Sequence, residues 1–163
     1  MKICHHPKAF GLTVVRVVLG IIFFMHGAHK VLGFYAPALG GAGGLTKTVG
    51  GFVAMGMPVK LAYMVCFGEL LGGIGLIFGI LSRVAALGIM IIMIGAIYTV
   101  HLKNGFFINW MMAPNVQHGY EFNLALLAMS FAIVISGPGR FAVDNLFCQK
   151  EETNAEIGMQ NAE

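Results

Sequence analysis

The sequence contains little charge. Only 10% of its 163 residues are charged, whereas 58% are hydrophobic, and the mean hydropathy is +0.82. Soluble domains carry about 25% charged residues, so the composition predicts an integral membrane protein with one small helical bundle. The formal net charge of +3 comes from basic residues scattered around the ends of hydrophobic segments. Because the chain has no basic stripe and no interleaved aromatic and basic residues, a nucleic-acid-binding surface is not expected.

Cysteine is also scarce. Cys4, Cys66 and Cys148 are far apart in the sequence, and none of them belongs to a Cys-x-x-Cys pair. A thiol–disulfide mechanism needs two neighbouring thiols, so we do not expect a disulfide relay. Cys66 is most simply a small apolar residue inside a helix. Cys4-His5-His6 and Cys148 lack the spacing of metal ligands, and we predict no metal site.

Four hydrophobic segments approach the length of about 20 residues that a membrane crossing requires. They cover residues 11–33, 59–81, 83–102 and 120–136. We therefore expect an all-α integral membrane protein, a four-transmembrane-helix antiparallel bundle built from residues 1–147. The connection after the first span is mildly amphipathic, which predicts a short interfacial helix from Thr46 to Met55. Residues 148–163 are polar and are expected to form a disordered tail.

The basic residues indicate an orientation. Loops on the cytoplasmic side of a membrane are enriched in Lys and Arg. With both termini in the cytoplasm, five basic residues lie inside and two loop lysines lie outside. The inner set is Lys2, Lys8, Arg83, Arg140 and Lys150, and the outer set is Lys47 and Lys103. We thus expect a multi-pass protein of a bacterial-type plasma (inner) membrane, with Arg16 as an anchor that reaches the cytoplasmic headgroups.

Ionisable residues in or beside the hydrophobic segments are the main indication of function. Glu69 lies in the middle of the second segment, where a carboxylate costs roughly 2.5 kcal/mol or more in lipid. His26 and Lys30 are four residues apart and share one face of the first helix. His101 ends the third segment, and Glu121 begins the fourth. In the expected topology all five belong to the outer half of the bundle, where they can form one polar site.

Each of these residues also has a structural interpretation. Glu69 can form an ion pair that locks two helices together. His26 can be a buried histidine that is hydrogen-bonded to a backbone carbonyl. Lys30, His101 and Glu121 can be residues at helix ends whose side chains reach water. The sequence leaves these alternatives open.

Glycines in the second segment suggest how Glu69 is shielded from lipid. Four of them recur every three or four residues and form a smooth stripe on one face: Gly68, Gly72, Gly75 and Gly79. Such stripes of small residues let two helices approach closely in a membrane. Because Glu69 lies beside this stripe, we expect close helix packing to hold the carboxylate against its partner.

Short motifs in a fixed order resemble the DoxX family of small membrane proteins. The resemblance covers roughly residues 10–147 and implies a four-helix membrane bundle. It also weakly implies a quinone-linked redox function, because the family is named after the membrane subunit of a thiosulfate:quinone oxidoreductase. The matching residues are Arg16, Gly20, His26-Gly-x-x-Lys30, Gly56-x-Pro58, Glu69-x-x-Gly72-Gly73, Gly79, Arg83, His101-x-x-Asn104-Gly-Phe-Phe, Gly119-Tyr-Glu121, Gly137-Pro-Gly139 and Asp144.

Three functions stay open at this point. The first is a quinone-interacting or accessory subunit of a membrane redox complex, in which Glu69, His26 and Lys30 are the candidate catalytic residues. Here His26, Lys30 or His101 hydrogen-bonds a quinone carbonyl, and Glu69 or Glu121 relays protons. The second is a non-catalytic membrane scaffold for partner enzymes, and the third is a small proton-coupled transporter. The first function requires quinone as cofactor and a redox partner protein, and self-association of the chain is open in all three.

Overall fold

The computed structural model describes residues 10–34, 44–114 and 116–146. Cys4, Cys148 and the tail 148–163 lie outside the described residues, so the expectations for them stay predictions. All regular structure in the described parts is helical. The elements are α1 (Phe10–Leu32), α2 (Leu45–Ala54), α3 (Val59–Phe78), α4 (Ser82–Ala96), the π-helical η1 (Ile97–His101), the 3-10 helix η2 (Leu102–Asn104) and α5 (Glu121–Ser136).

The helices coincide closely with the hydrophobic segments of the sequence. Three helical stretches are long and apolar enough to cross a membrane: α1, α3 and the continuous run Ser82–Asn104. The fourth, α5, is apolar but shorter. Large apolar side chains such as Leu71 and Ile91 remain exposed on the helix surfaces, as expected where lipid tails take the place of water. The expected all-α membrane bundle is confirmed, and a helix is present where the interfacial one was predicted.

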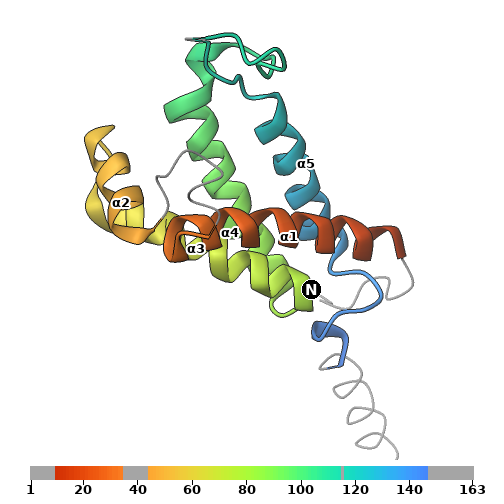
Figure 1. Ribbon diagram of the computed structural model, residues 1–163. Coiled ribbons are helices and arrows are strands. Elements are labelled where there is room, and N and C mark those ends of the chain that lie inside the picture. Colours follow the sequence, from red (N-terminus) through yellow and green to blue (C-terminus); the bar gives the residue numbers. More distant parts are fainter. Residues whose placement is uncertain (1–9, 35–43, 115, 147–163) are drawn as a thin grey trace, which may run out of the picture.

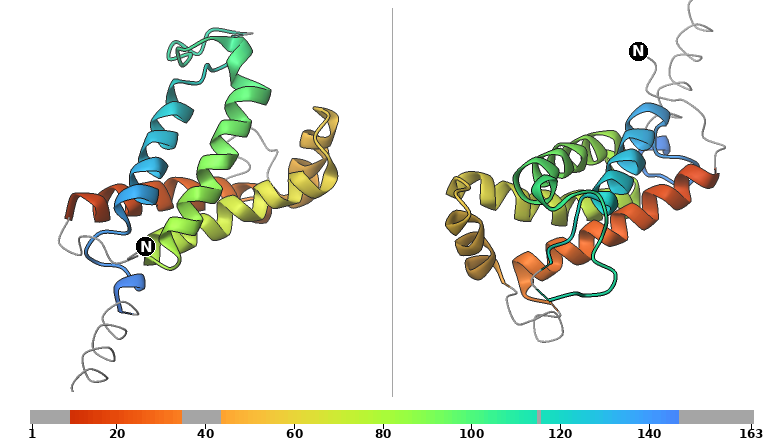
Figure 2. Two further views of the ribbon diagram at one scale, coloured as in Figure 1. Left: turned by 180° about the vertical axis from the view of Figure 1, so that it is seen from behind. Right: turned by 90° about the horizontal axis from the view of Figure 1, so that it is seen from above.

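The four long helices are arranged as two antiparallel pairs. α1 packs along α3, and α4 packs along α5, while a tight turn at 79–81 joins α3 to α4. Figure 1 shows α4 and α5 side by side, crossing α1 at a steep angle. The pairs meet where α3 turns into α4, which we call the turn end of the molecule. Figure 2 shows that they diverge from there, so the far ends of α1 and α4 lie apart.

Close contact between α1 and α3 depends on glycines from both helices. A Cβ atom at Gly20 would lie 2.8 Å from the backbone nitrogen of Ile77. Added Cβ atoms at Gly27 and Gly73 would overlap the backbones of Leu70 and Phe24, respectively. The two helices therefore pack backbone against backbone, as small residues permit in membranes.

The glycine stripe predicted from the sequence lies against α4. An added Cβ at Gly68 would approach Ile92 at 3.2 Å, and one at Gly72 would approach Ile89 at 3.3 Å, so these positions face α4 rather than α1. Gly79 ends α3 in the left-handed region with a φ of 73°. The close contact beside Glu69 is thus provided by Gly73, which follows Glu69 by one helical turn.

Arg16 corrects a prediction made from the sequence. Its side chain does not reach toward headgroups, because the residue is buried, with 1% of its surface exposed. Its guanidinium donates hydrogen bonds to the backbone carbonyls of Pro138, at 3.0 Å, and Phe141. The segment after α5 folds back across the turn end and supplies these acceptors, which a hydropathy pattern does not reveal.

Asp144 completes the same polar connection at the turn end. Its carboxylate accepts hydrogen bonds from the backbone amides of Leu81, at 2.7 Å, and Ser82, at 2.8 Å. These amides open α4, whose N-terminus favours a negative charge. The beginning of α1 and the segment after α5 therefore lie at one end of the molecule, as an even number of crossings requires.

Candidate functional site

The central feature of the site is an ion pair between α1 and α3. The Lys30 ammonium nitrogen lies 2.5 Å from each carboxylate oxygen of Glu69. Glu69 is buried, with 3% of its surface exposed, and 21% of the Lys30 side chain is exposed. The ion pair that the sequence left open for Glu69 is therefore present, its partner is Lys30, and the Lys30 charge compensates the buried carboxylate.

Helix α2 covers one side of this ion pair. The Lys30 ammonium lies 5.7 Å from the centre of the Phe52 ring, within the range of a cation–π interaction. The Thr48 hydroxyl donates a hydrogen bond of 3.3 Å to the backbone carbonyl of Lys30. Val49 packs in a small apolar cluster with Ala62 and Cys66 of α3. The Phe52 ring therefore covers the Lys30 ammonium, and the other two contacts hold α2 against α1 and α3.

His26 lies one helical turn before Lys30 on α1. Its side chain is exposed and forms no hydrogen bond with any residue that the structure describes, so the interpretation as a buried, satisfied histidine is wrong. Residues four apart in a helix share one face, so the imidazole lies on the same side of α1 as the Lys30 side chain. His26 thus offers an exposed ring on the face of α1 that carries the buried ion pair.

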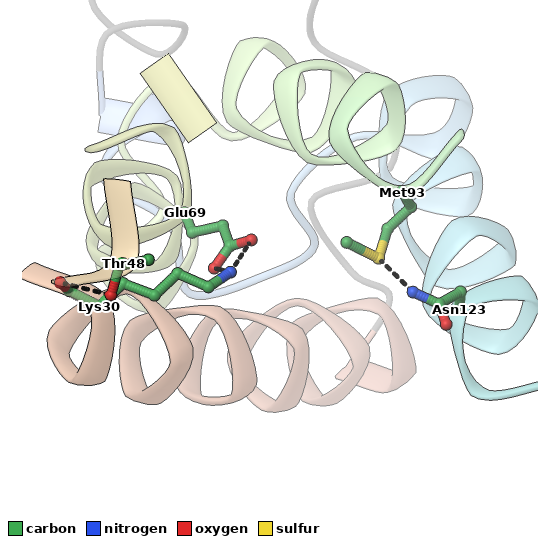
Figure 3. Close-up of polar contacts among 5 residues, drawn as sticks. All are labelled: Lys30, Thr48, Glu69, Met93 and Asn123. Carbon is green, nitrogen blue, oxygen red and sulfur yellow. Dashed lines mark hydrogen bonds and ion pairs between the residues drawn. The ribbon is translucent and has the colours of Figure 1, made fainter. Parts of the chain in front are cut away.

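Two residues of the second helix pair lie across from the ion pair in Figure 3. The Asn123 side-chain amide of α5 donates to the Met93 sulfur of α4 at 3.5 Å. Figure 3 shows Glu69 on one side, and Met93 with Asn123 on the other, pointing into the space between the two helix pairs. Neither residue was a candidate site residue from the sequence. A polar residue near the start of the fourth span was a usable signal for Asn123, but nothing in the sequence distinguishes Met93 from ten other methionines.

The structure does not bring His101 and Glu121 to this site. His101 Nδ1 is 2.9 Å from the backbone carbonyl oxygen of His118, and the Glu121 carboxylate accepts a 3.2 Å hydrogen bond from the Ile108 amide. Both contacts organise the connection between α4 and α5. Because the two helix pairs diverge away from the turn end, the expected single polar site is divided into two separate groups.

The arrangement suits a small ligand with hydrogen-bond acceptors. An ammonium has three N–H donors, and Glu69 uses two of those of Lys30, so one stays available. His26 adds a ring nitrogen that can donate or accept. Among the described residues, no group of three or more His, Cys, Asp or Glu is placed to hold a metal ion. The side chains present are therefore chemically able to donate a hydrogen bond or a proton to an acceptor group.

Comparison with known proteins agrees with this architecture. Residues 11–102 match the DoxX family. CatD of Bacillus subtilis, whose designation as an oxidoreductase is provisional, is 31% identical over 90% of this chain and 93% of its own. An uncharacterized membrane protein of Mycobacterium tuberculosis is 30% identical over 88% of this chain and 85% of its own. The inner membrane protein YqjF of Escherichia coli is 26% identical over 86% of this chain and 94% of its own.

No solved structure matches the chain significantly. The family match nevertheless covers more than half of the sequence and includes His26, Lys30 and Glu69. The relatives named as membrane proteins agree with the three helical stretches that are long enough to cross a bilayer. The chain is a membrane protein and belongs to the DoxX family.

Proposed function

We propose that this protein is a quinone-interacting subunit of a redox complex in a bacterial-type inner membrane. The observation that carries the proposal is the exposed His26 ring beside the buried Lys30–Glu69 ion pair. Buried ionisable groups in membrane helices are expensive and commonly mark functional sites. The provisional oxidoreductase designation of CatD supports the same class of function.

The donor set fits a quinone headgroup. A bound quinone supplies an apolar ring with two carbonyls, and its reduction takes up two electrons and two protons. His26 offers a ring nitrogen with no protein partner among the described residues. Lys30 retains one N–H donor after pairing with Glu69. His26 and Lys30 lie one helical turn apart on α1, so both can donate hydrogen bonds to the carbonyl oxygens of such a ring.

Glu69 has a supporting role in this proposal. Its carboxylate favours the charged, donating form of Lys30 and fixes the direction of the ammonium group. It can also accept a proton from Lys30, and the charges of the pair are then removed together. His26, at the exposed edge of the site, can exchange protons with the membrane surface. Electrons would come from a partner protein or a soluble donor.

A scaffold without chemistry is the second candidate. The observation that favours it is the complete use of both Glu69 oxygens by Lys30, as in an ion pair that only joins α1 to α3. A scaffold requires the helix contact but not the charges. A double substitution that keeps a hydrogen-bonded pair without charge therefore separates the two candidates.

The test is organic extraction of the gently purified protein, with quinone quantified per protein chain against an unrelated membrane protein of similar size. We expect stoichiometric quinone in the wild type. Glu69→Gln and the Lys30→Gln/Glu69→Gln double variant should lose most of it while remaining folded by size-exclusion chromatography. Lys60→Gln is the matched control, because Lys60 is an exposed residue of the same helix as Glu69.

The quinone proposal predicts loss of quinone from the double variant, whereas the scaffold predicts that this variant still assembles with partner proteins. Wild-type quinone content in that variant would show that the charges are not needed for binding and would contradict the assigned site. Background quinone in the wild type, both in detergent and in lipid nanodiscs, would contradict the quinone proposal itself. Retained assembly of partner proteins by the double variant would then favour the scaffold.

A further inference from the structure

The connection between α4 and α5 carries an apolar tip at the far end of the second helix pair. We define the tip by four residues with large exposed side chains: Phe107, Trp110, Met111 and Met112. Met111 is 91% exposed and Trp110 is 76% exposed. We propose that this tip is a preformed membrane anchor, which inserts between the lipid headgroups and the outer part of the acyl chains.

The tip is a folded element, held from inside by Asn109. The Asn109 side-chain nitrogen donates to the carbonyls of Ala113, at 3.0 Å, and Val116, at 2.9 Å. Its side-chain oxygen accepts a 3.0 Å hydrogen bond from the Ala113 amide. One side chain thus satisfies three backbone groups of the loop. Because the loop backbone is already ordered, its exposed apolar side chains can bind a partner or a bilayer with little further loss of conformational entropy.

A second set of contacts fixes the base of the tip to α5. The Gly119 amide donates to the Phe107 carbonyl at 3.1 Å, and the Tyr120 amide donates to the Gly105 carbonyl at the same distance. Glu121, the first residue of α5, accepts from the Ile108 amide at 3.2 Å. Irregular backbone tolerates a lipid boundary only where its polar groups are satisfied, and these contacts satisfy several of them.

The lengths of the two helices place the tip at the edge of the hydrocarbon layer. The run Ser82–Asn104 has 23 residues, which corresponds to about 34 Å at 1.5 Å per residue and exceeds a core of about 30 Å. α5 has 16 residues, or about 24 Å, and is too short to span that core alone. The loop therefore begins near the headgroups, where the run Ser82–Asn104 ends. On its way back to α5 it crosses the part of the hydrocarbon layer that α5 is too short to span.

The chemistry of the tip fits lipid rather than water or a charged protein. The sequence from Gly105 to Gly119 contains no Asp, Glu, Lys or Arg, and Lys103 and Glu121 flank it. Trp, Phe and Met are suited to the headgroup boundary because their large apolar groups tolerate partial hydration. The tip is also continuous with helices whose outer faces already meet lipid. The helix lengths, the absence of charged residues from Gly105 to Gly119 and the position of the tip therefore all favour a bilayer as its binding partner.

Trp110 provides a direct test, because it is the only tryptophan in the chain. The full-length protein is reconstituted in phosphatidylcholine vesicles, and its tryptophan fluorescence is quenched by lipids brominated near the glycerol or near the chain end, and by aqueous iodide. We expect blue-shifted emission, stronger quenching by shallow than by deep bromines, and little quenching by iodide. Trp110→Phe provides the blank.

Substitutions in the tip test whether its apolar character places it there. Met111→Glu should draw the tip toward water and raise iodide quenching several-fold, whereas Met111→Leu should leave both quenching profiles unchanged. Strong iodide quenching and no bromolipid quenching in the wild type would overturn the proposal. Weak quenching by both, which rises on dilution of the protein in lipid, would also overturn it and would identify a second copy as the occupant.

Discussion

Lys30 contacts both carboxylate oxygens of Glu69 across the interface between α1 and α3. Glycines of both helices allow the two backbones to approach closely at this interface. Gly73 follows Glu69 by one helical turn, and its position leaves no room for a Cβ beside the Phe24 backbone. The ion pair and the close helix packing therefore depend on each other. Any change that separates α1 from α3 should also weaken the site.

Gly73→Ala is expected to push the two helices apart. Its Cβ would overlap the Phe24 backbone, which cannot move without shifting the helix. We expect a loss of roughly 1–3 kcal/mol in stability, as for overpacked cores, together with a loss of bound quinone. Gly88→Ala on α4 is the control, because an added Cβ there meets nothing within 4 Å. Thermal unfolding in detergent checks both, and equal melting temperatures for the two variants would contradict the close-contact account.

The Lys30–Glu69 pair should show strong coupling in a double-mutant cycle. Lys30→Met leaves a buried carboxylate without its partner, which costs about 3–5 kcal/mol unless the group becomes protonated. Lys30→Met/Glu69→Met removes both charges and should recover much of that loss, while quinone binding stays lost. Unfolding free energies of the two single variants and the double variant give the coupling. Additive effects would indicate that the two side chains do not interact in the membrane protein.

Arg16 should stabilise the turn end through the carbonyls of Pro138 and Phe141. Arg16→Met leaves these acceptors unpaired, and we expect a loss of roughly 3 kcal/mol for two hydrogen bonds from a charged donor. Arg16→Lys should recover little, because an ammonium does not reproduce the forked guanidinium. Arg140→Gln, at an exposed position in the same segment, serves as control in thermal unfolding. A wild-type melting temperature for Arg16→Met would contradict this stabilising role.

Asp144 should contribute to the start of α4. Its carboxylate accepts from the Leu81 and Ser82 amides, and Leu81 has a φ of 48°, a conformation that costs energy for a leucine. Asp144→Ala is expected to lower stability by about 1–2 kcal/mol, in the range of a lost helix cap. Hydrogen exchange should show faster exchange of these two amides in particular. Unchanged protection at Leu81 and Ser82 would contradict the capping role.

Much of the fold is predictable because membrane helices are specified by local sequence. Hydropathy located all four long helices, and the Leu81-Ser82-Arg83 turn required α3 and α4 to be antiparallel. The pairing of Glu69 with a basic residue was also predictable, since an isolated carboxylate in lipid is costly. Lys30 was among the possible partners because it lies near the end of another hydrophobic segment.

The relative rotation and crossing of the helices were not predictable from the sequence. The glycine stripe of α3 was expected beside Glu69, yet Gly68 and Gly72 face α4, while Gly73 contacts α1. His101 and Glu121 were expected at the ion pair, but they hold the connection after α4. A rotation of 100° between neighbouring residues decides such contacts, and composition carries little information about it. The burial of Arg16 likewise depends on the return of residues after α5.

The most direct test of the central claim is photolabelling of the purified protein with a photoreactive quinone, followed by mass spectrometry of the adducts. We predict adducts in α1 around His26 and Lys30 and in α3 around Glu69, which excess unlabelled quinone removes and Glu69→Gln strongly reduces. The Lys60→Gln control should be labelled like the wild type. Adducts confined to the α4–α5 connection, or adducts that excess quinone does not reduce, would contradict a quinone site at the Lys30–Glu69 pair.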